Sequence, residues 1–296
     1  PNFPLLSSVF KDFSLTIHSF SEKGIIFKSQ LRKMIISELK EFFKNQLSEI
    51  YADSEISELF SIFCNQILRM DKFELRISQH HIISEEQTRV FKQLISELKT
   101  GKPYQQILGE TEFYGLKFFV DENVLIPRPE TEELFELTIS EIQKRNLKNT
   151  KILDIGTGSG IIPIVLKNKL PQAKVSAIDF SEKALKTAKK NADFHNLDIN
   201  FIHQNYLQEN LSEVYDIIIS NPPYIGTDEE TDIADSVKEF EPKMALFSPT
   251  SNALIFYEKI AEDCKNHLAE NGMVFLEINQ KLGNETKALF TDVLSE

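Results

Sequence analysis

The sequence predicts an α/β protein in which a doubly wound parallel sheet follows an N-terminal helical bundle and a linking β-hairpin. Before residue 103 the apolar residues repeat with the period of amphipathic helices. After residue 150 short apolar runs alternate with helical segments, the pattern of a parallel sheet covered by helices. One of these runs leads directly into a glycine-rich turn and a helix, which indicates a ligand site at the carboxyl ends of the strands.

Length, composition and charge limit the classes of protein that this chain can be. Its 296 residues exceed one typical domain, and 41% hydrophobic residues suffice for a buried core. No apolar run approaches the roughly 18 residues of a membrane span, so we expect a cytoplasmic protein. The net charge of -12 argues against binding nucleic acid through the overall field. Cys64, Cys264 and the six histidines match no metal or redox spacing, so we expect buried thiols and no metal.

The N-terminal segment, residues 1–33, shows no steady apolar period and only one arginine, so it does not resemble a transit peptide. Met34 is the first methionine, and helical periodicity becomes clear directly after it. We therefore expect Met34 to lie near the natural start and residues 1–33 to be an upstream extension.

Residues 34–102 are expected to form a small helical bundle. Their aromatic and aliphatic residues follow the i, i+4, i+7 rhythm of helices that pack on one face, which is more typical of a bundle core than of a cofactor site. Ser84 with Gln87 matches a capping box, and Gly101 ends that helix. The expected helices cover 35–47, 53–70 (capped at Asp53 or Ser54) and 84–101, with a short helical turn over 73–78.

Residues 103–127 are expected to link the two parts through a hairpin, with strands over 107–114 and 116–120 that meet near Gly115. The stretch Ile126 to Glu132 follows. Its two prolines stiffen the entry to a helix, and Thr131 with the next glutamates supplies capping and acidic groups at the positive helix end. A purely structural helix start would explain this stretch equally well.

A glycine turn marks the first ligand-binding element of the part that begins at residue 128. The strand 151–155 leads into Gly156, Thr157, Gly158, Ser159 and Gly160, and a helix is expected over 161–169. Glycines let the backbone approach a ligand, and the amides of a helix start point toward it. The spacing differs from that of a dinucleotide site, and Asp154 is expected to organise the turn or to reach an ammonium group.

An acid and an aromatic residue follow the next two strands. Asp179 ends the strand 174–179, where its carboxylate can accept both ribose hydroxyls of a nucleoside. After a helix over 182–195 and a strand over 199–203, Asn205 and Tyr206 are expected to flank an adenine. These residues predict a nucleoside ligand without a requirement for a pyrophosphate.

The expected acceptor socket follows the strand 216–220 and consists of Asn221, Pro222, Pro223 and Tyr224. The prolines end the strand, the planar Asn221 amide both donates and accepts hydrogen bonds, and the Pro222 carbonyl adds an acceptor. Tyr224 offers a flat apolar face. Together they would hold a flat nitrogen nucleophile, although the tetrapeptide alone could also be a simple turn.

The remaining segments complete the expected sheet. Residues 227–240 are acidic and irregular enough for a mobile lid, residues 241–246 form a turn, and a helix over 253–268 leads to a fifth strand over 273–278. Because this fold is expected to close with two further strands, we expect the α/β part, residues 128–296, to lack them and to be incomplete at its C-terminal end. The fifth strand would then form an exposed edge.

The chain resembles the release factor glutamine methyltransferase family (PrmC, also called HemK) from about Met34 onward. The glycine turn and Asn-Pro-Pro-Tyr are shared with other methyltransferases, whereas three motifs and the N-terminal bundle are more specific. The chain departs from the family at 248–252, where the family usually has a glycine-rich stretch. The specific motifs are Gly109-Glu110 with Phe113-Tyr114-Gly115, then Ile126 to Glu132, and Phe240-Glu241-Pro242 with Ala245-Leu246.

The resemblance implies a class I methyltransferase fold with S-adenosyl-L-methionine as cofactor and S-adenosyl-L-homocysteine as product. It implies methylation of the side-chain nitrogen (N5) of the glutamine in the Gly-Gly-Gln motif of class 1 peptide release factors. The catalytic residues would lie between Asn221 and Tyr224, and Asn221 would also touch the cofactor. Neither a membrane nor a nucleic acid is expected as a partner.

Two alternatives stay open at this point. An exocyclic amine of a nucleic-acid base, such as N6 of a flipped adenine, would fit the same socket, although the acidic charge disfavours it. A protein that binds the cofactor or a release factor without catalysis is the second alternative.

Overall fold

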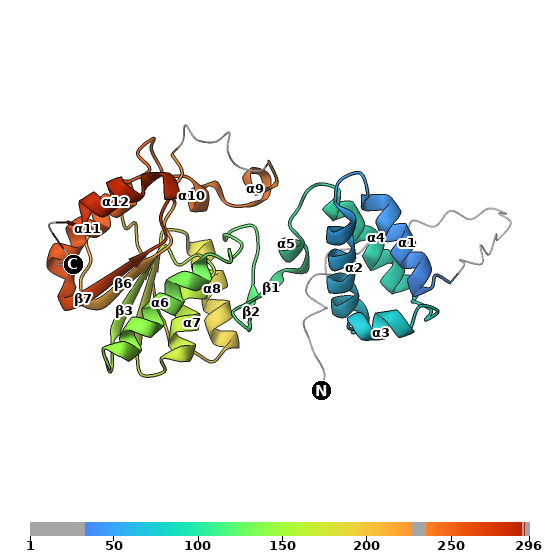
Figure 1. Cartoon of the computed structure of the whole chain (residues 1–296), viewed down its shortest axis with the longest axis horizontal. Coiled ribbons are helices and arrows are strands. Elements are labelled where there is room, and N and C mark those ends of the chain that lie inside the picture. The colour runs from blue at the N-terminus through green and yellow to red at the C-terminus, as the bar shows by residue number, and fades with distance from the viewer. Residues whose placement is uncertain (1–32, 227–234, 292, 294–296) are drawn as a thin grey trace, which may run out of the picture.

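The computed structural model describes residues 33–226, 235–291 and 293 of the chain. Within these residues, a helical bundle and an α/β part are joined by a short helix and a hairpin (Figure 1). The expected N-terminal extension lies outside the described residues except for Lys33, and so do residues 227–234 of the expected lid. None of the helices in the described part is long and apolar enough to cross a membrane.

The helical bundle forms because its helices present apolar stripes to one another. The aromatic rings of Phe43, Phe60, Phe63 and Phe91 are buried in its core, and neighbouring rings lie 5.5 to 6.4 Å apart. The predicted capping box at Ser84 is present. The bundle consists of α1 (Ile36–Leu47), α2 (Asp53–Leu68), α3 (Lys72–Ile77) and α4 (Glu85–Leu98).

The link between the two parts is a helix followed by a hairpin. The expected strand from Ile107 is wrong at its start, because Ile107 and Leu108 complete a short helix that packs against the bundle core. Gly109 ends this helix in the left-handed conformation, with φ 70°. The link contains α5 (Tyr104–Leu108), β1 (Glu110–Phe113) and β2 (Leu116–Phe119), and the two strands are antiparallel.

The α/β part is built on a five-stranded parallel sheet in the order β5-β4-β3-β6-β7, which confirms the predicted doubly wound topology. The chain order reverses between β3 and β6, and a crevice forms at such a switch point beyond the carboxyl ends of the strands. The strands are β3 (Lys151–Ile155), β4 (Lys174–Asp179), β5 (Asn200–His203), β6 (Tyr215–Ser220) and β7 (Leu268–Leu276).

Two helical layers cover the sheet because successive strand residues point to opposite faces. Ile152 and Ile217 pack with α6 (Thr131–Lys144), α7 (Ile161–Lys169) and α8 (Glu182–Phe194). Leu153 and Ile218 pack with α11 (Ile255–His267) and α12 (Gly283–Leu289) on the other face. All four side chains are fully buried, so the sheet is a rigid platform for the loops at its carboxyl edge.

The C-terminal segments differ from the sequence expectations in two places. Strand β7 begins at Leu268 instead of Met273, because α11 runs straight into it and an irregularity near Asn271, with φ 63°, shifts its register against β6. Within the expected lid, Asp235–Phe240 forms the helix α9. The segment continues through α10 (Lys243–Leu246), and a 3-10 turn (Gln280–Leu282) precedes α12.

Candidate functional site

A cavity of about 700 Å³ opens at the carboxyl edge of the sheet. Its walls come from the loops that follow β3, β4, β5 and β6, as expected for a doubly wound sheet. Residues at the start of α6 and in the segment after α9 also line the cavity. The cavity therefore collects most of the predicted site residues, namely Gly156, Thr157, Gly158, Ser159, Asp179, Asn205, Tyr206, Asn221 and Pro223.

The glycine turn after β3 adopts a backbone that favours glycine. Gly156, Gly158 and Gly160 have φ values of 77°, 55° and 81°. The amides of Gly156 and Thr157 donate to the carbonyl of Ile178 at 2.9 and 3.0 Å, which fixes the turn against β4. Gly160 is not among the residues that line the cavity. A Cβ there would lie 3.0 Å from Cβ of Ala188, so Gly160 permits close packing of α7 on α8.

Asp179 organises the glycine turn. One of its carboxylate oxygens accepts the Gly158 amide at 2.8 Å, and the other accepts the Ser181 amide at 2.8 Å. Burial raises the pKa of Asp179, and these backbone hydrogen bonds oppose that shift. Each carboxylate oxygen can accept more than one hydrogen bond, so the side chain can still receive hydroxyl groups from the cavity.

Asp154, which was expected to organise the turn or to reach an ammonium group, lies in β3 directly before the turn. Its side chain is fully buried, and neither carboxyl oxygen has a hydrogen-bond partner in the described part of the chain. Burial raises the pKa of Asp154 to about 7, the neighbouring Thr157 hydroxyl opposes this shift, and the charge of Asp179 adds to it. The hydroxyl of the buried Thr157 at the cavity wall is also without a partner among the described residues.

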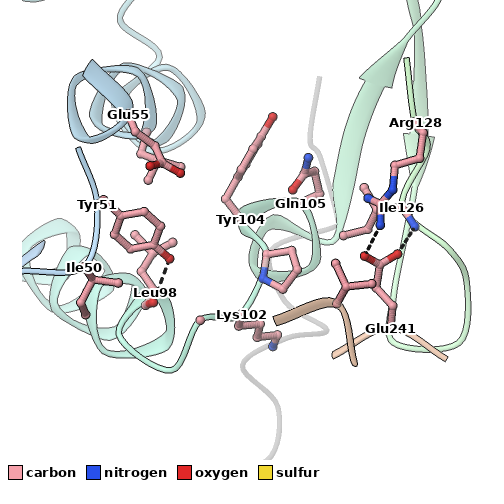
Figure 2. A pocket seen from close by; sticks show the side chains of 14 residues that line it. Ile50, Tyr51, Glu55, Leu98, Lys102, Tyr104, Gln105, Ile126, Arg128 and Glu241 are labelled. Carbon is pink, nitrogen blue, oxygen red and sulfur yellow. Dashed lines mark hydrogen bonds and ion pairs between the residues drawn. The ribbon is translucent and has the colours of Figure 1, made fainter. Parts of the chain in front are cut away.

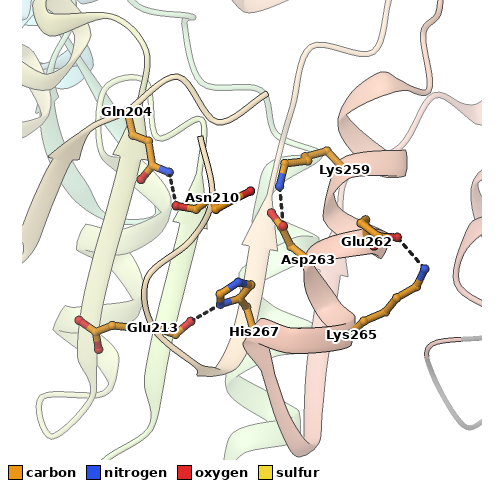
Figure 3. A network of polar contacts seen from close by, with 8 residues as sticks. All are labelled: Gln204, Asn210, Glu213, Lys259, Glu262, Asp263, Lys265 and His267. Carbon is orange, nitrogen blue, oxygen red and sulfur yellow. Dashed lines mark hydrogen bonds and ion pairs between the residues drawn. The ribbon is translucent and has the colours of Figure 1, made fainter. Parts of the chain in front are cut away.

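Tyr206 lines the cavity, but its side chain is anchored in the core beside α11. It is 4% exposed, and the ammonium of Lys259 lies 5.4 Å from its ring centroid. Lys259 in turn donates to Asp263 at 2.5 Å (Figure 3). His267 also reaches back to the carbonyl of Glu213 at 2.9 Å, as Figure 3 shows, so α11 holds the loop between β5 and β6 in place.

Only two of the four residues predicted to form the acceptor socket line the cavity. Asn221 and Pro223 line the cavity, whereas Pro222 and Tyr224 are not among the lining residues. Tyr224 is half-buried and packs against the core between β6 and α11, where burial raises its pKa. Its carbonyl accepts Nδ2 of Asn279 at 3.2 Å. Tyr224 therefore anchors the loop to the core and does not form part of the cavity wall.

Two residues that sequence reasoning did not connect with Asn221 lie directly beside it. Nδ2 of Asn221 donates to Oγ1 of Thr131 at 3.3 Å, and the Thr131 hydroxyl donates to Oε2 of Glu277 at 2.9 Å. Thr131 was expected to cap α6, but the residue at the cap position is Glu130. Burial raises the pKa of Glu277, while the Thr131 hydroxyl opposes the shift. Glu277 could have been found from the sequence, because it is an acidic residue directly after an apolar strand, where ligand sites of such sheets lie.

The loop 248–252, which lacks the usual glycines, is closed by side-chain hydrogen bonds. The hydroxyl of Ser248 donates to the carbonyl of Asn252 at 2.7 Å, and Oγ1 of Thr250 accepts the Asn252 amide at 3.1 Å. Pro249 and Thr250 form part of the cavity wall. Sequence reasoning also missed the apolar residues of this wall, which are Met244, Ala245, Phe247, Ile255 and Phe256.

A second cavity of about 390 Å³ lies between the bundle and the start of the α/β part. In Figure 2, Tyr51 and Glu55 of the bundle lie on one side, and Arg128 and Glu241 lie on the other. The buried carboxylate of Glu241 accepts from Arg128 at 2.5 Å and from the amide of Ile126 at 3.0 Å. This ion pair ties the proline-rich stretch to the segment after α9, and Arg128 also borders the larger cavity.

The two cysteines are buried and free, and burial raises the pKa of each thiol to about 12. They are therefore inert thiols of the core, as expected. In the part of the chain that the structure describes, no group of three or more histidine, cysteine or acidic residues is arranged to hold a metal ion.

The chain is similar to proteins of known families. A PrmC N-terminal domain family matches residues 38–109, and a methyltransferase small domain family matches residues 135–240. The release factor glutamine methyltransferase of Flavobacterium psychrophilum is 46% identical over 258 residues, which cover 86% of this chain and 90% of that protein. The release factor glutamine methyltransferase of Streptococcus pneumoniae is 38% identical over 259 residues, which cover 87% of this chain and 91% of that protein. A solved methyltransferase from Pyrococcus furiosus aligns at 19% identity over 64% of this chain and 83% of that one, with a TM-score of 0.43.

Proposed function

The chain belongs to the release factor glutamine methyltransferase family, and from this premise we propose that it methylates the glutamine of the Gly-Gly-Gln motif in class 1 peptide release factors. The methyl group would come from S-adenosylmethionine and go to the side-chain amide nitrogen. The observation that carries the proposal is that Asn221 lines the same cavity as the glycine turn and Asp179. A polar amide acceptor thus lies next to a nucleoside-type pocket.

The cavity fits S-adenosylmethionine on three observations. Its volume of about 700 Å³ lies in the range of cofactor pockets. Gly156 and Gly158 have no side chain, and a Cβ added at either position would meet nothing within 4 Å, so a ligand can approach their backbone closely. The carboxylate of Asp179 at the cavity wall offers acceptors that the hydroxyl groups of a nucleoside can satisfy. When bound, S-adenosylmethionine supplies an electrophilic methyl group.

The task of this chain's own residues is to hold a weak nucleophile. An amide nitrogen reacts poorly because its lone pair is delocalised into the carbonyl. We expect Oδ1 of Asn221 to accept one N–H of the substrate glutamine. The Pro222 carbonyl is the proposed acceptor of the other N–H, although Pro222 is not among the residues that line the cavity. Positioning of this kind contributes several orders of magnitude to a rate, and it needs no strong base. Pro223 would form the wall beside the acceptor, and Tyr224 would stabilise the loop.

The two parts of the chain suggest two separate roles. We propose residues 34–102 as the substrate-recognition domain, residues 103–127 as the link, and residues 128–296 as the methyltransferase domain. The match of the PrmC N-terminal domain family to residues 38–109 supports treating the bundle as a separate domain. The second cavity lies where the bundle faces Arg128 and Glu241, and Arg128 lines both cavities.

Replacement of Asn221 by alanine tests the proposed acceptor site. The rate of methyl transfer from tritiated S-adenosylmethionine to a purified release factor should fall about 100-fold or more, by analogy with the loss of a preorganised hydrogen-bonding group. Binding of S-adenosylhomocysteine, measured by calorimetry, should change much less and serves as the control for folding. A rate within threefold of wild type would exclude Asn221 from the acceptor site.

A further inference from the structure

A chain of two part-buried hydrogen bonds through the buried Thr131 connects the carboxylate of Glu277, which directly follows β7, with the amide of Asn221. Glu277 accepts the Thr131 hydroxyl at 2.9 Å, and Thr131 accepts Nδ2 of Asn221 at 3.3 Å. We propose that Thr131 and Glu277 are positioning residues that fix which way the Asn221 amide faces. This inference rests on the proposed function of Asn221 as the acceptor of a substrate N–H.

The chemistry of the three side chains decides which group donates and which accepts in the two hydrogen bonds. An ionised carboxylate only accepts hydrogen bonds, so the Thr131 proton must point toward Glu277. The Thr131 oxygen then presents a lone pair to Asn221, and only the NH₂ side of the amide can satisfy it. A flipped amide would set two acceptor oxygens against each other. Asn221 is therefore held with Oδ1 on the side away from Thr131, as the acceptor that remains for a substrate.

The carboxylate end of the chain is itself fixed. The Glu277 amide donates to the carbonyl of Ser220 at 3.0 Å, directly before Asn221. The hydroxyl of Tyr257, a fully buried residue of α11, donates to the Glu277 carbonyl at 3.0 Å. Burial and the charge of Glu130 raise the pKa of Glu277, whereas the Thr131 hydroxyl, the Asn221 amide and the charge of Arg128 lower it, so the NH₂ group of Asn221 faces the Glu277 carboxylate as well as Thr131. These hydrogen bonds hold the backbone at Glu277 and directly before Asn221. The orientation of the Asn221 amide is therefore set before a substrate binds.

A purely structural role for Thr131 does not account for these contacts. A capping threonine accepts a backbone amide of its own helix, whereas the Thr131 hydroxyl bonds to side chains 90 and 146 residues away. Thr138 on the same helix shows the ordinary alternative, because its buried hydroxyl donates to the Leu134 carbonyl at 2.8 Å. Thr138 therefore provides a matched control for the loss of a buried threonine hydroxyl from α6.

The substitution Thr131→Val removes the hydroxyl and keeps the shape of the side chain. We expect kcat to fall about tenfold, equivalent to about 1.4 kcal/mol, while KM for the release factor and Kd for S-adenosylhomocysteine stay within threefold. Thr131→Ser should recover most of the lost rate, and Thr138→Val should keep the wild-type kcat. Glu277→Gln, which leaves the volume nearly unchanged, should also lower kcat and replaces Thr131→Val if that variant does not fold.

The double variant Thr131→Val with Asn221→Ala shows whether the two residues act together. Once Asn221 is gone, the loss of Thr131 should have no further effect on kcat, because there is no amide left to orient. A further tenfold loss, or a wild-type kcat in both Thr131→Val and Glu277→Gln, would overturn the positioning role. If Asn221→Ala alone keeps the wild-type rate, the proposed function of Asn221 fails instead, so the two failures are distinguishable.

Discussion

Replacing Asp179 by alanine should weaken cofactor binding about 100-fold, and the structure shows why. The carboxylate accepts the amides of Gly158 and Ser181, each at 2.8 Å. Alanine removes both acceptors at once. The glycine turn then loses its anchor to β4 at Gly158, and the cavity loses the acceptors that we assign to the ribose hydroxyls.

The size of the effect follows from these contacts. A hydrogen bond to a charged group contributes about 1.5–3 kcal/mol. If ligand binding loses the equivalent of one or two such bonds, the free energy of binding falls by about 3 kcal/mol, which is about a 100-fold change in Kd. Asp179→Asn keeps one acceptor oxygen but turns an NH₂ toward a backbone donor. We expect it to weaken binding about tenfold, on the same scale.

Calorimetric titration with S-adenosylhomocysteine measures this change directly. Asp216 provides the matched control, because its carboxylate also accepts a backbone amide, that of Lys151 at 2.7 Å, but at the opposite end of the sheet. Asp216→Ala should lower the melting temperature without changing Kd. A folded Asp179→Ala variant that binds within threefold of wild type would refute the reasoning for Asp179.

Two further predictions concern stability. Burial raises the pKa of Asp154 from 3.8 to about 7, so its contribution to stability is full below pH 3.8 and is lost as the pH rises to about 7. In urea unfolding at several pH values, Asp154→Asn should gain stability relative to wild type across that window, and parallel profiles would contradict the assignment. Gly160→Ala should lose about 1–3 kcal/mol, since φ is 81° and its Cβ would meet Ala188 at 3.0 Å. Gly283→Ala is the control and should be neutral or slightly stabilising, because its φ is -59° and its Cβ would come no closer than 3.8 Å to a neighbouring side chain.

The elements that local chemistry decides were predicted well from the sequence. Ser84 and Gln87 form the expected capping box, and the alternation of strands and helices after residue 150 gives the observed parallel sheet. The strand expected from Ile107 was wrong at its start because α5 is set by packing on the bundle and by the bond from Gln106 to the Phe240 carbonyl at 2.8 Å. Such contacts join residues far apart in the chain, and no local pattern reports them.

The same limit applies to the site. Gly158, Asp179 and Asn221 follow strand ends in recognisable motifs, and the sheet brings them to one cavity. Thr131 and Glu277 are 146 residues apart in sequence, so their hydrogen bond could not be predicted, and Thr131 was interpreted as a helix cap. Their roles became visible only in the three-dimensional arrangement.

The identity of the acceptor is the most direct test of the account. Tritiated S-adenosylmethionine is supplied with the protein and either an intact class 1 release factor or the same factor with alanine in place of the Gly-Gly-Gln glutamine. We predict label in the intact factor alone. Equal labelling of both factors, or label in added nucleic acid and in neither factor, would contradict the proposed function.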